Sequence, residues 1–177
     1  KEGERFVMGV GMLFPRKGLL DFIEVAKSFP DVKFIWFGDL KPLFTQLRIL
    51  RAIKHRPPNV IMAGYCEGDL IKGAYQSASA MFFPSYEENE GIVVLEALAS
   101  RCPILLRDIE VYRSWLKEGL NCRKANDNEG FIKELKDLLD NGEDPLVLEE
   151  GYKVALSKDL SLIGKQLKEA YESLMKK

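Results

Sequence analysis

Residues 80–99 read AMFFPSYEENEGIVVLEALA. The apolar run 80–83 predicts a buried strand, which is broken at Pro84 by an acidic turn. Gly91 then begins a predicted helix over residues 91–100. Its apolar positions follow helical spacing: Ile92, Leu95, Leu98 and Ala99. The succession of strand, polar loop, glycine and helix is typical of an α/β fold.

The turn between this strand and this helix carries groups that suit a phosphorylated, hydroxylated ligand. Backbone N–H groups in the first turn of a helix have no partner inside the helix, so a phosphate can accept hydrogen bonds from them. Glu88 stands at the tip of the loop and Glu96 on the second turn of the helix. An ionised carboxylate only accepts hydrogen bonds, which suits sugar or ribose hydroxyls. The stretch therefore predicts a nucleotide-sugar site.

Strands and helices alternate along most of the chain. Strands are predicted at 5–10, 32–37, 59–63, 80–83, 103–106 and 121–124. Helices are predicted at 18–28, 43–55, 69–77, 91–100 and 110–117, followed by 129–139, 144–157 and 160–175. Near-continuous apolar strands with helices between them predict a doubly wound, Rossmann-like parallel sheet of about six strands, covered by helices on both faces. Neither a linker nor a repeat interrupts the pattern, so we expect one domain over residues 1–177.

Ligands of such sheets bind outside the carboxyl ends of the strands. Here those ends carry the loops 11–17, 38–39, 64–66 and 85–91, which we expect to meet at one edge. The first loop ends in Arg16 and Lys17, two cations that can bind a diphosphate. The alternative is a solvated charge pair at a helix start, where the helix dipole mildly disfavours cations.

The composition excludes several classes of protein. The 177 residues carry a formal net charge of −1, which predicts no nucleic-acid binding. The cysteines, Cys66, Cys102 and Cys122, form no CxxC pair, and with no leader segment they indicate a reducing compartment. No apolar run approaches the roughly 20 residues needed to span a bilayer. Neither an Asp-x-Asp motif nor a cluster with metal-ligand spacing is found, so we expect no metal ion.

The motif resembles a known family. Glu88 and Glu96, with seven residues between them inside residues 84–99, are similar to the donor-site signature of retaining glycosyltransferases of family 4. Those enzymes have the GT-B fold of two Rossmann-like halves. The run ENEGIVVLEALAS at 88–100, followed by RDI at 107–109, is similar to diacylglycerol glucosyltransferases of Gram-positive bacteria. The resemblance covers nearly the whole chain and implies the C-terminal, donor-binding half, a fragment without its N-terminal acceptor-binding domain.

The resemblance also implies roles for individual residues. Lys17 would bind the donor phosphates, and Arg16 would assist, because Met12 stands where the family usually has an arginine. Glu88 would accept hydrogen bonds from hydroxyls of the transferred sugar, and Glu96 from the ribose. Surface acids without a ligand are the alternative for both carboxylates.

The other donor-binding residues that the resemblance implies are Gly11, Tyr65, Asn89, Gly91, Ile92 and Val93. The last three would present backbone N–H groups to the phosphates. Asn89 and Glu90 replace the middle of the commoner Glu-Gly-Phe-Gly, and we expect Glu90 to face away from the diphosphate. Tyr65 would border the base, with packing on its own helix as the alternative.

The implied reaction is transfer of a hexose, glucose from UDP-glucose, to a diacylglycerol-type lipid acceptor with retention of configuration. The negative charge of the leaving diphosphate would be stabilised by Lys17, Arg16 and the helix N-terminus, without a metal cofactor. A same-fold transferase acting on a polysaccharide or teichoic acid intermediate is an alternative, and a non-catalytic nucleotide-binding module is another. A fragment without the acceptor half is expected to be inactive. An NAD-type domain is disfavoured because no GxGxxG follows the first strand.

A basic amphipathic helix is predicted within residues 41–56. Its cations are Lys41, Arg48, Arg51, Lys54 and Arg56, interleaved with leucine and isoleucine. Such a helix can bind an anionic membrane surface, or it can pack on the sheet with a solvated basic face. The unpaired cysteines lead us to expect a cytoplasmic protein. The basic helix adds the hypothesis of peripheral attachment to the inner face of the cell membrane.

Overall fold

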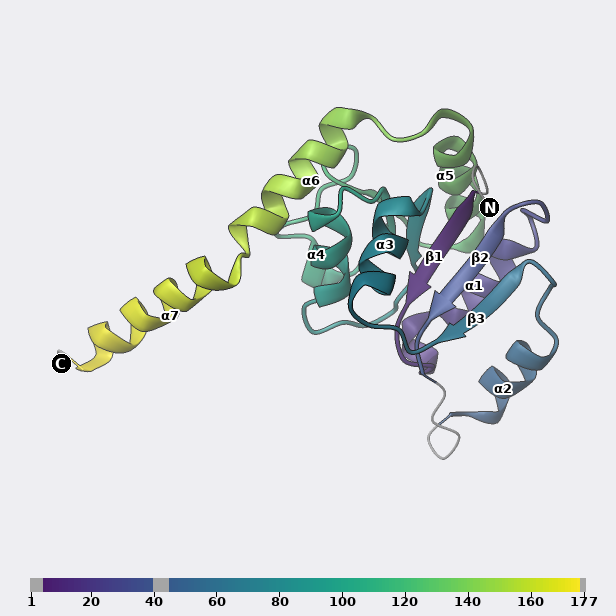
Figure 1. The fold of residues 1–177 in the computed structure, drawn as a ribbon, viewed down its shortest axis with the longest axis horizontal. Coiled ribbons are helices and arrows are strands. Elements are labelled where there is room, and N and C mark those ends of the chain that lie inside the picture. The colour runs from purple at the N-terminus through teal and green to yellow at the C-terminus, as the bar shows by residue number, and fades with distance from the viewer. Residues whose placement is uncertain (1–4, 40–44, 176–177) are drawn as a thin grey trace.

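The computed structural model describes residues 5–39 and 45–175 (Figure 1). In these residues a six-stranded parallel sheet has the order β3-β2-β1-β4-β5-β6. The strands are β1 (Phe6–Val10), β2 (Lys33–Phe37), β3 (Val60–Gly64), β4 (Ala80–Phe83), β5 (Ile104–Arg107) and β6 (Arg123–Ala125). The order reverses between β1 and β4, as expected for a doubly wound sheet. The predicted fold class is confirmed.

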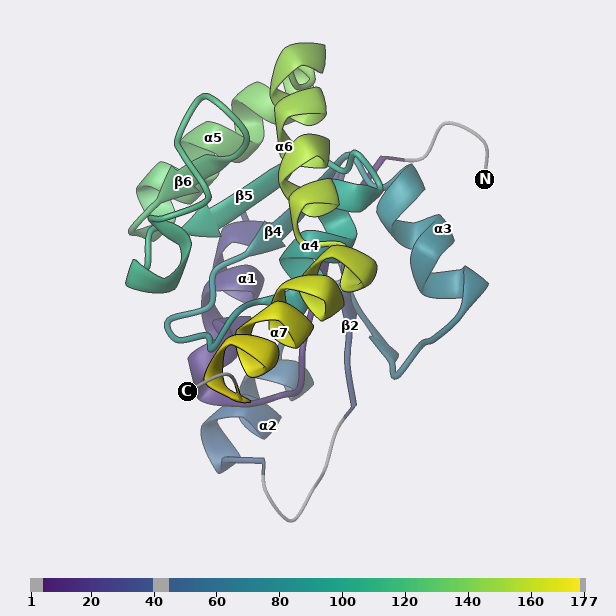
Figure 2. The ribbon, with the colours of Figure 1, turned by 90° about the vertical axis from the view of Figure 1, so that its left-hand side faces the viewer.

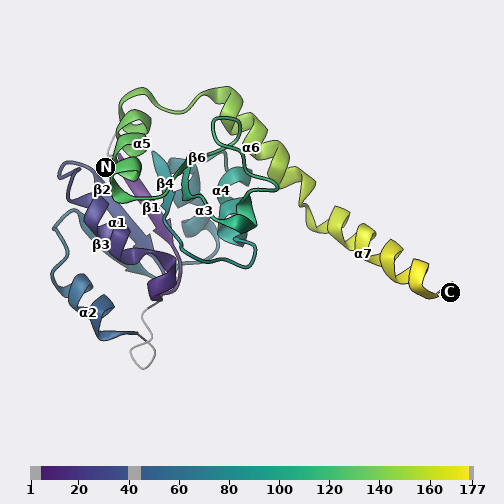
Figure 3. The same ribbon diagram turned by 180° about the vertical axis from the view of Figure 1, so that it is seen from behind.

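Helices cover both faces of the sheet. They are α1 (Leu19–Ala26), α2 (Leu47–Lys54), α3 (Asp69–Ser77), α4 (Ile92–Ala99), α5 (Asn128–Asn141), α6 (Pro145–Ser157) and α7 (Leu160–Met175). Short 3₁₀ turns η1 (Pro15–Lys17) and η2 (Glu110–Tyr112) lie in two of the loops. Seen from behind, α1, α2 and α5 lie in front of the sheet (Figure 3). Turned by 90°, the sheet stands between α1 and α5 on one side and α3 and α4 on the other (Figure 2).

Neighbouring strand residues contribute to opposite halves of the core. Val7 and Phe82 belong to the cluster under α1 and α5, whereas Met8 and Phe83 belong to the cluster under α3 and α4. This follows from the period of two along a strand. The first cluster is rich in aromatic contacts, with the Phe22 ring 5.1 Å from Trp36. Both faces of each central strand are therefore apolar, which explains the unbroken apolar runs in the sequence.

The helix predicted over residues 110–117 is wrong. Only the turn η2 forms there, and the chain then continues as a loop. Asn121 supplies the reason, because its Oδ1 accepts a hydrogen bond from the Lys117 N–H and its Nδ2 donates to the Trp115 carbonyl. These bonds satisfy backbone groups that helical hydrogen bonds would otherwise satisfy.

Of the four apolar positions noted at helical spacing in α4, only Leu98 is buried. The buried residues of α4 are Val94, Ala97 and Leu98, whereas Ile92 is 64% exposed. Almost every position of this helix is apolar, so the spacing alone does not single out one face. The neighbour decides instead, because α6 packs on α4, where a Cβ on Gly151 would lie 2.6 Å from Leu98 Cδ2.

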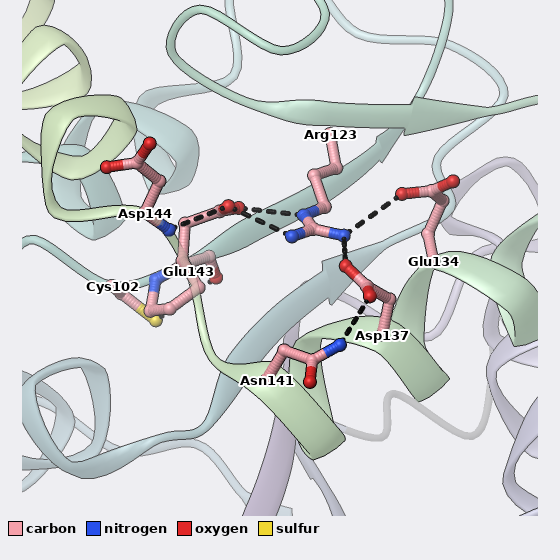
Figure 4. A network of polar contacts seen from close by, with 8 residues as sticks. Cys102, Arg123, Glu134, Asp137, Asn141, Glu143 and Asp144 are labelled. Carbon is pink, nitrogen blue, oxygen red and sulfur yellow. Dashed lines mark hydrogen bonds and ion pairs between the residues drawn. The ribbon is translucent and has the colours of Figure 1, made fainter.

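A cluster of charges around Arg123 attaches the C-terminal helices to the sheet (Figure 4). The Arg123 guanidinium donates from Nε and Nη2 to the two carboxylate oxygens of Glu143, at 2.9 and 3.1 Å. It also donates to Glu134 and Asp137 of α5, and Asp137 in turn accepts from Asn141. The Glu143 side chain is only 4% exposed, so the paired carboxylate is largely removed from solvent.

The last helix, α7, extends away from the sheet (Figures 1 and 3). Every residue of α7 is exposed, including Leu167 and Tyr171. In the part of the chain that the structure describes, no helix has the length and apolar character needed to cross a membrane. The predicted basic helix forms as α2, with Ile49 buried and its cations exposed, while Lys41 lies outside the described residues.

Candidate active site

The loops that follow β1 to β4 meet at one edge of the sheet, because parallel strands all end there. A cavity of about 950 Å³ opens at this edge. The ends of β1 and β2, the 65–68 loop, α3 and α4 line it. Its lining includes Gly11, Tyr65, Cys66, Tyr75 and Glu96. The cavity is large enough for a nucleoside-sized ligand.

Lys17 and Glu88 form an ion pair close to the start of α4. Lys17 Nζ lies 2.5 Å from Glu88 Oε1, and the two side chains are 15% and 7% exposed. The Ser85 hydroxyl lies 2.7 Å from the same Glu88 oxygen. Glu88 therefore points into the protein, and the alternative of a solvated surface acid is wrong for this residue.

Close approach of two loops brings this pair together. Gly18 has a φ of +76°, and a Cβ at this position would lie 2.3 Å from the Pro84 carbonyl oxygen, so only glycine fits. The Tyr86 N–H donates to the Arg16 carbonyl at 2.7 Å, and Arg16 Nη1 donates to the Glu87 carbonyl at 3.0 Å. The loop 11–18 and the loop 84–91 thus lie directly on each other.

The N-terminus of α4 has no side-chain cap. Gly91 is its N-cap, with a φ of +80° and no side-chain hydrogen bond to the first turn. A Cβ on Gly91 would lie 2.6 Å from the Tyr112 hydroxyl, which is buried and has no hydrogen-bond partner among the described residues. Ile92, the first residue of the helix, is exposed. The uncapped end and the helix dipole together favour an anion at this place.

Glu96 lies one turn further along α4, exposed at the cavity wall. The Tyr75 hydroxyl, from the adjacent helix α3, donates a hydrogen bond to Glu96 Oε2 at 3.0 Å. Tyr75 is 2% exposed. Burial and the nearby Glu96 carboxylate raise the pKa of Tyr75, so the phenol stays protonated and remains a donor.

The residues predicted for the site fall into two neighbouring groups. Gly11, Tyr65 and Glu96 line the cavity, whereas Lys17 and Glu88 lie beside the start of α4 and outside its lining. Arg16 is exposed and bonded to the Glu87 carbonyl, and Asn89 and Glu90 are exposed on the loop. Tyr65 is 70% exposed at the cavity rim and donates to Glu67, so it does not pack on its own helix.

Sequence reasoning missed Arg107, which supports the loop carrying Glu88. Arg107 is buried at the end of β5, where its Nε donates to the Pro84 carbonyl at 3.2 Å. Its Nη2 pairs with Asp21 of α1 at 3.1 Å, and its guanidinium lies over the Tyr86 ring, 4.0 Å from the ring centre. The run RDI at 107–109 pointed to this region, but nothing in it identified a buried guanidinium.

The cations at this edge, together with the start of α4, offer places for an anionic group. Lys17, Arg16 and the start of α4 all attract negative charge. Within residues 5–39 and 45–175, no three histidine, cysteine, aspartate or glutamate side chains are grouped in a way that could hold a metal ion.

Comparison with known sequences identifies the family. The profile of the family described as "Glycosyl transferases group 1" matches residues 1–153. The processive diacylglycerol alpha-glucosyltransferase of Acholeplasma laidlawii is 47% identical over 173 residues, which cover 98% of this chain and 52% of that protein. The alpha-galactosylglucosyldiacylglycerol synthase of Streptococcus pneumoniae is 30% identical over 117 residues, covering 63% and 31%. The chain thus spans about half or less of the length of these relatives.

Solved structures share the fold. Sucrose-phosphate synthase from Thermosynechococcus elongatus superposes with a TM-score of 0.86 at 18% identity, covering 98% of this chain and 46% of that one. Anabaena HepE in complex with UDP-glucose gives a TM-score of 0.83 at 17% identity, covering 97% and 49%. The predicted half of a GT-B fold is confirmed, and together with the profile match this shows that the chain belongs to the group 1 glycosyltransferases.

Proposed function

We propose that this chain binds UDP-glucose and forms the donor-binding half of a retaining glycosyltransferase that glucosylates a diacylglycerol-type lipid. One observation carries the proposal: Lys17, Glu88 and the uncapped N-terminus of α4 lie next to a cavity that Glu96 lines. A cation, an anion-binding helix end and two carboxylates are the groups that a sugar diphosphate requires.

Each part of the donor is assigned to the region of the site whose charge and hydrogen-bonding groups suit it. The base and ribose occupy the cavity, and Glu96 accepts hydrogen bonds from the ribose hydroxyls. The diphosphate lies at the N-terminus of α4, where Gly91, Ile92 and Val93 offer backbone N–H groups. Glu88 accepts from hydroxyls of the transferred glucose. An ammonium group has three donors, so Lys17 can bind the diphosphate while it remains paired with Glu88.

The catalytic contribution of these residues is electrostatic. As the bond between glucose and diphosphate breaks, negative charge accumulates on the leaving phosphate. Lys17 and the α4 N-terminus stabilise that charge, with Arg16 as a further cation, while the acceptor attacks from the same face. Because these groups neutralise the charge, we propose that no divalent ion is needed and expect EDTA to leave turnover unchanged.

The name of the 47% identical relative supports a diacylglycerol-type acceptor. We propose that the acceptor binds a part of the whole protein outside this chain. On α2, the exposed cations Arg48, Arg51 and Lys54 lie beside Leu47, which is 70% exposed. This face suits an anionic bilayer, so we propose a cytoplasmic protein held peripherally at the membrane.

The whole enzyme tests the proposal with UDP-[14C]glucose and vesicles containing diacylglycerol. We expect Lys17→Ala and Glu88→Ala each to reduce kcat by about 100-fold or more, as loss of a transition-state contact does. Lys153→Ala is the matched control, because Lys153 is an exposed cation on α6 that pairs only with Glu150 among the described residues. Near-normal turnover in both site variants would refute the assignment.

The radiolabelled product distinguishes the acceptors. Label in chloroform-soluble glycolipid supports the lipid acceptor. Label found only in a polysaccharide or teichoic acid intermediate would show that this intermediate, and not the lipid, is the acceptor.

The donor is tested separately by titrating the 177-residue chain with UDP, UDP-glucose, GDP and ADP while its amide NMR signals are followed. We expect selective shifts with the uridine nucleotides, and absence of binding to any nucleotide would refute the donor site.

A further inference from the structure

The carboxylate at the cavity wall is held by a residue from another helix. Tyr75 Oη of α3 donates to Glu96 Oε2 of α4 at 3.0 Å, and both residues line the cavity of about 950 Å³. The Tyr75 ring is packed in the core between the sheet and these two helices. A fixed phenol thus contacts an exposed glutamate, whose side chain would otherwise rotate freely.

We infer that Tyr75 is a positioning residue, which orients the Glu96 carboxylate so that it can accept hydrogen bonds from two vicinal ribose hydroxyls. This inference rests on the proposed function, because it takes the ligand to be a ribonucleotide with its ribose at Glu96. It adds a residue that selects for the ribose and not for the base or the phosphates.

The hydrogen-bonding capacity of a carboxylate permits this role. A glutamate has about four acceptor sites on its two oxygens, and the Tyr75 hydroxyl uses one of them. The remaining sites on Oε1 and Oε2 are available to the cavity. Two adjacent hydroxyls can then each donate to one oxygen, provided that the carboxylate is held at a suitable rotation.

The Tyr75 hydroxyl should remain a hydrogen-bond donor to Glu96 over a wide range of pH. Burial, with the Glu96 charge as a second cause, raises the pKa of Tyr75 above that of an exposed tyrosine. The phenol therefore stays a neutral donor throughout the range of pH in which enzymes of this kind work. The orientation of Glu96 by Tyr75 should accordingly not vary with pH between 6 and 9.

A purely structural role for the hydroxyl predicts a different result. Glu96 is exposed, so water can replace the bond from Tyr75 without leaving a buried charge unpaired. If the hydroxyl only completed the core, Tyr75→Phe would alter stability slightly and leave the preference for ribose over deoxyribose unchanged. The preference between these two sugars therefore separates positioning from packing.

The test measures binding of UDP and 2′-deoxyuridine diphosphate to the 177-residue chain by calorimetry. For Tyr75→Phe we expect the Kd of UDP to rise about fivefold to tenfold, the order of the net contribution of one ordinary hydrogen bond. The Kd of the deoxy compound should change less than about twofold, so the preference for ribose shrinks. In a Glu96→Ala background, Tyr75→Phe should have no further effect.

Tyr152→Phe is the matched control, because Tyr152 lies on α6 and contacts Arg101, and neither residue lines the cavity. It should bind both nucleotides as the unaltered chain does. Thermal unfolding of each variant verifies that it is folded, and the phenyl ring keeps the packing of residue 75.

The outcomes distinguish the two proposals. Unchanged ribose preference in Tyr75→Phe, together with its loss in Glu96→Ala, would overturn the role of Tyr75 and leave the donor site intact. Equal binding of UDP by the unaltered chain and by Glu96→Ala would remove Glu96 from the ribose site, and the inference would fail with it. No binding of UDP by the unaltered chain would overturn the donor site itself.

Discussion

Lys17 Nζ lies 2.5 Å from Glu88 Oε1, although the two residues are 71 positions apart in the chain. Neither side chain is more than 15% exposed. A carboxylate that is so poorly hydrated depends on its cation, because an unpaired buried charge is strongly unfavourable. The pair thus connects the stability of the fold with the arrangement of the site.

Replacing Lys17 alone should destabilise the chain more than replacing both partners. Lys17→Met leaves the Glu88 carboxylate without its cation, and we expect a loss of about 3 kcal/mol in the free energy of unfolding. In Lys17→Met/Glu88→Gln no charge remains, and much of that loss should be recovered. Urea denaturation of the unaltered chain, of Lys17→Met, of Glu88→Gln and of the double variant measures the free energy of unfolding of each. Additive effects of the two substitutions would show that the pair is not coupled.

Tyr112→Phe should not destabilise the chain. The Tyr112 hydroxyl is buried and finds no hydrogen-bond partner among the described residues. Removing it therefore costs no bond, and we expect a gain of up to about 1 kcal/mol in the free energy of unfolding. Calorimetric melting measures this. A loss of more than about 1 kcal/mol would mean that the hydroxyl has a partner, such as an internal water.

Cys66 should react with iodoacetamide before the other cysteines. Cys66 is partly exposed at the cavity, whereas burial raises the pKa of both Cys102 and Cys122 to about 12. Only a thiolate reacts, so at pH 8 the two buried thiols should stay unmodified in the folded chain. Peptide mass spectrometry gives the order, with urea-unfolded chain as the control.

The same reaction reports on occupancy of the cavity. If UDP binds there, it should protect Cys66 from alkylation, since Cys66 belongs to the lining. Free uracil and inorganic diphosphate serve as partial ligands for comparison. Equal alkylation rates with and without saturating UDP would exclude the nucleotide from this part of the site.

Part of the acid sensitivity of the fold should depend on Lys124. A hydrogen bond from Lys124 holds the pKa of Asp108 below its usual value of about 4. Because the folded-state pKa is the lower one, this group adds stability above pH 4, and the contribution disappears as the pH falls through the folded-state pKa. Lys124→Met should therefore flatten the loss of stability between pH 4 and pH 2. Chemical denaturation at several pH values in this range measures the free energy of unfolding. An unaltered dependence of that free energy on pH would contradict the role assigned to Lys124.

The elements of the fold could be predicted wherever local signals were sufficient. The predicted bounds 80–83 and 69–77 agree with β4 and α3, because an apolar run and an amphipathic pattern there are each bounded by turn residues. The region 110–117 was not predictable in this way. Its conformation depends on hydrogen bonds from Asn121, a residue that lies beyond the segment and contributes nothing to its periodicity.

The site was predictable only as far as its motif extends. The spacing of Glu88 and Glu96 and the position of Lys17 indicated where the charges would gather. The partners of these groups come from distant parts of the chain, since Tyr75 reaches Glu96 from 21 positions away and on another helix. Nothing in the sequence around Tyr75 distinguishes it from an ordinary core tyrosine. Such partners follow from the packing of α3 on α4, which a sequence pattern does not specify.

The close approach of Gly18 to Pro84 has a consequence for recombining these enzymes. Backbone contacts fix the separation of the loops 11–18 and 84–91, and each loop hydrogen-bonds to the other through Arg16 and Tyr86. A chimera that takes one loop from a homologue and keeps the other would have mismatched surfaces at that contact. The two segments should therefore be exchanged together when such enzymes are recombined.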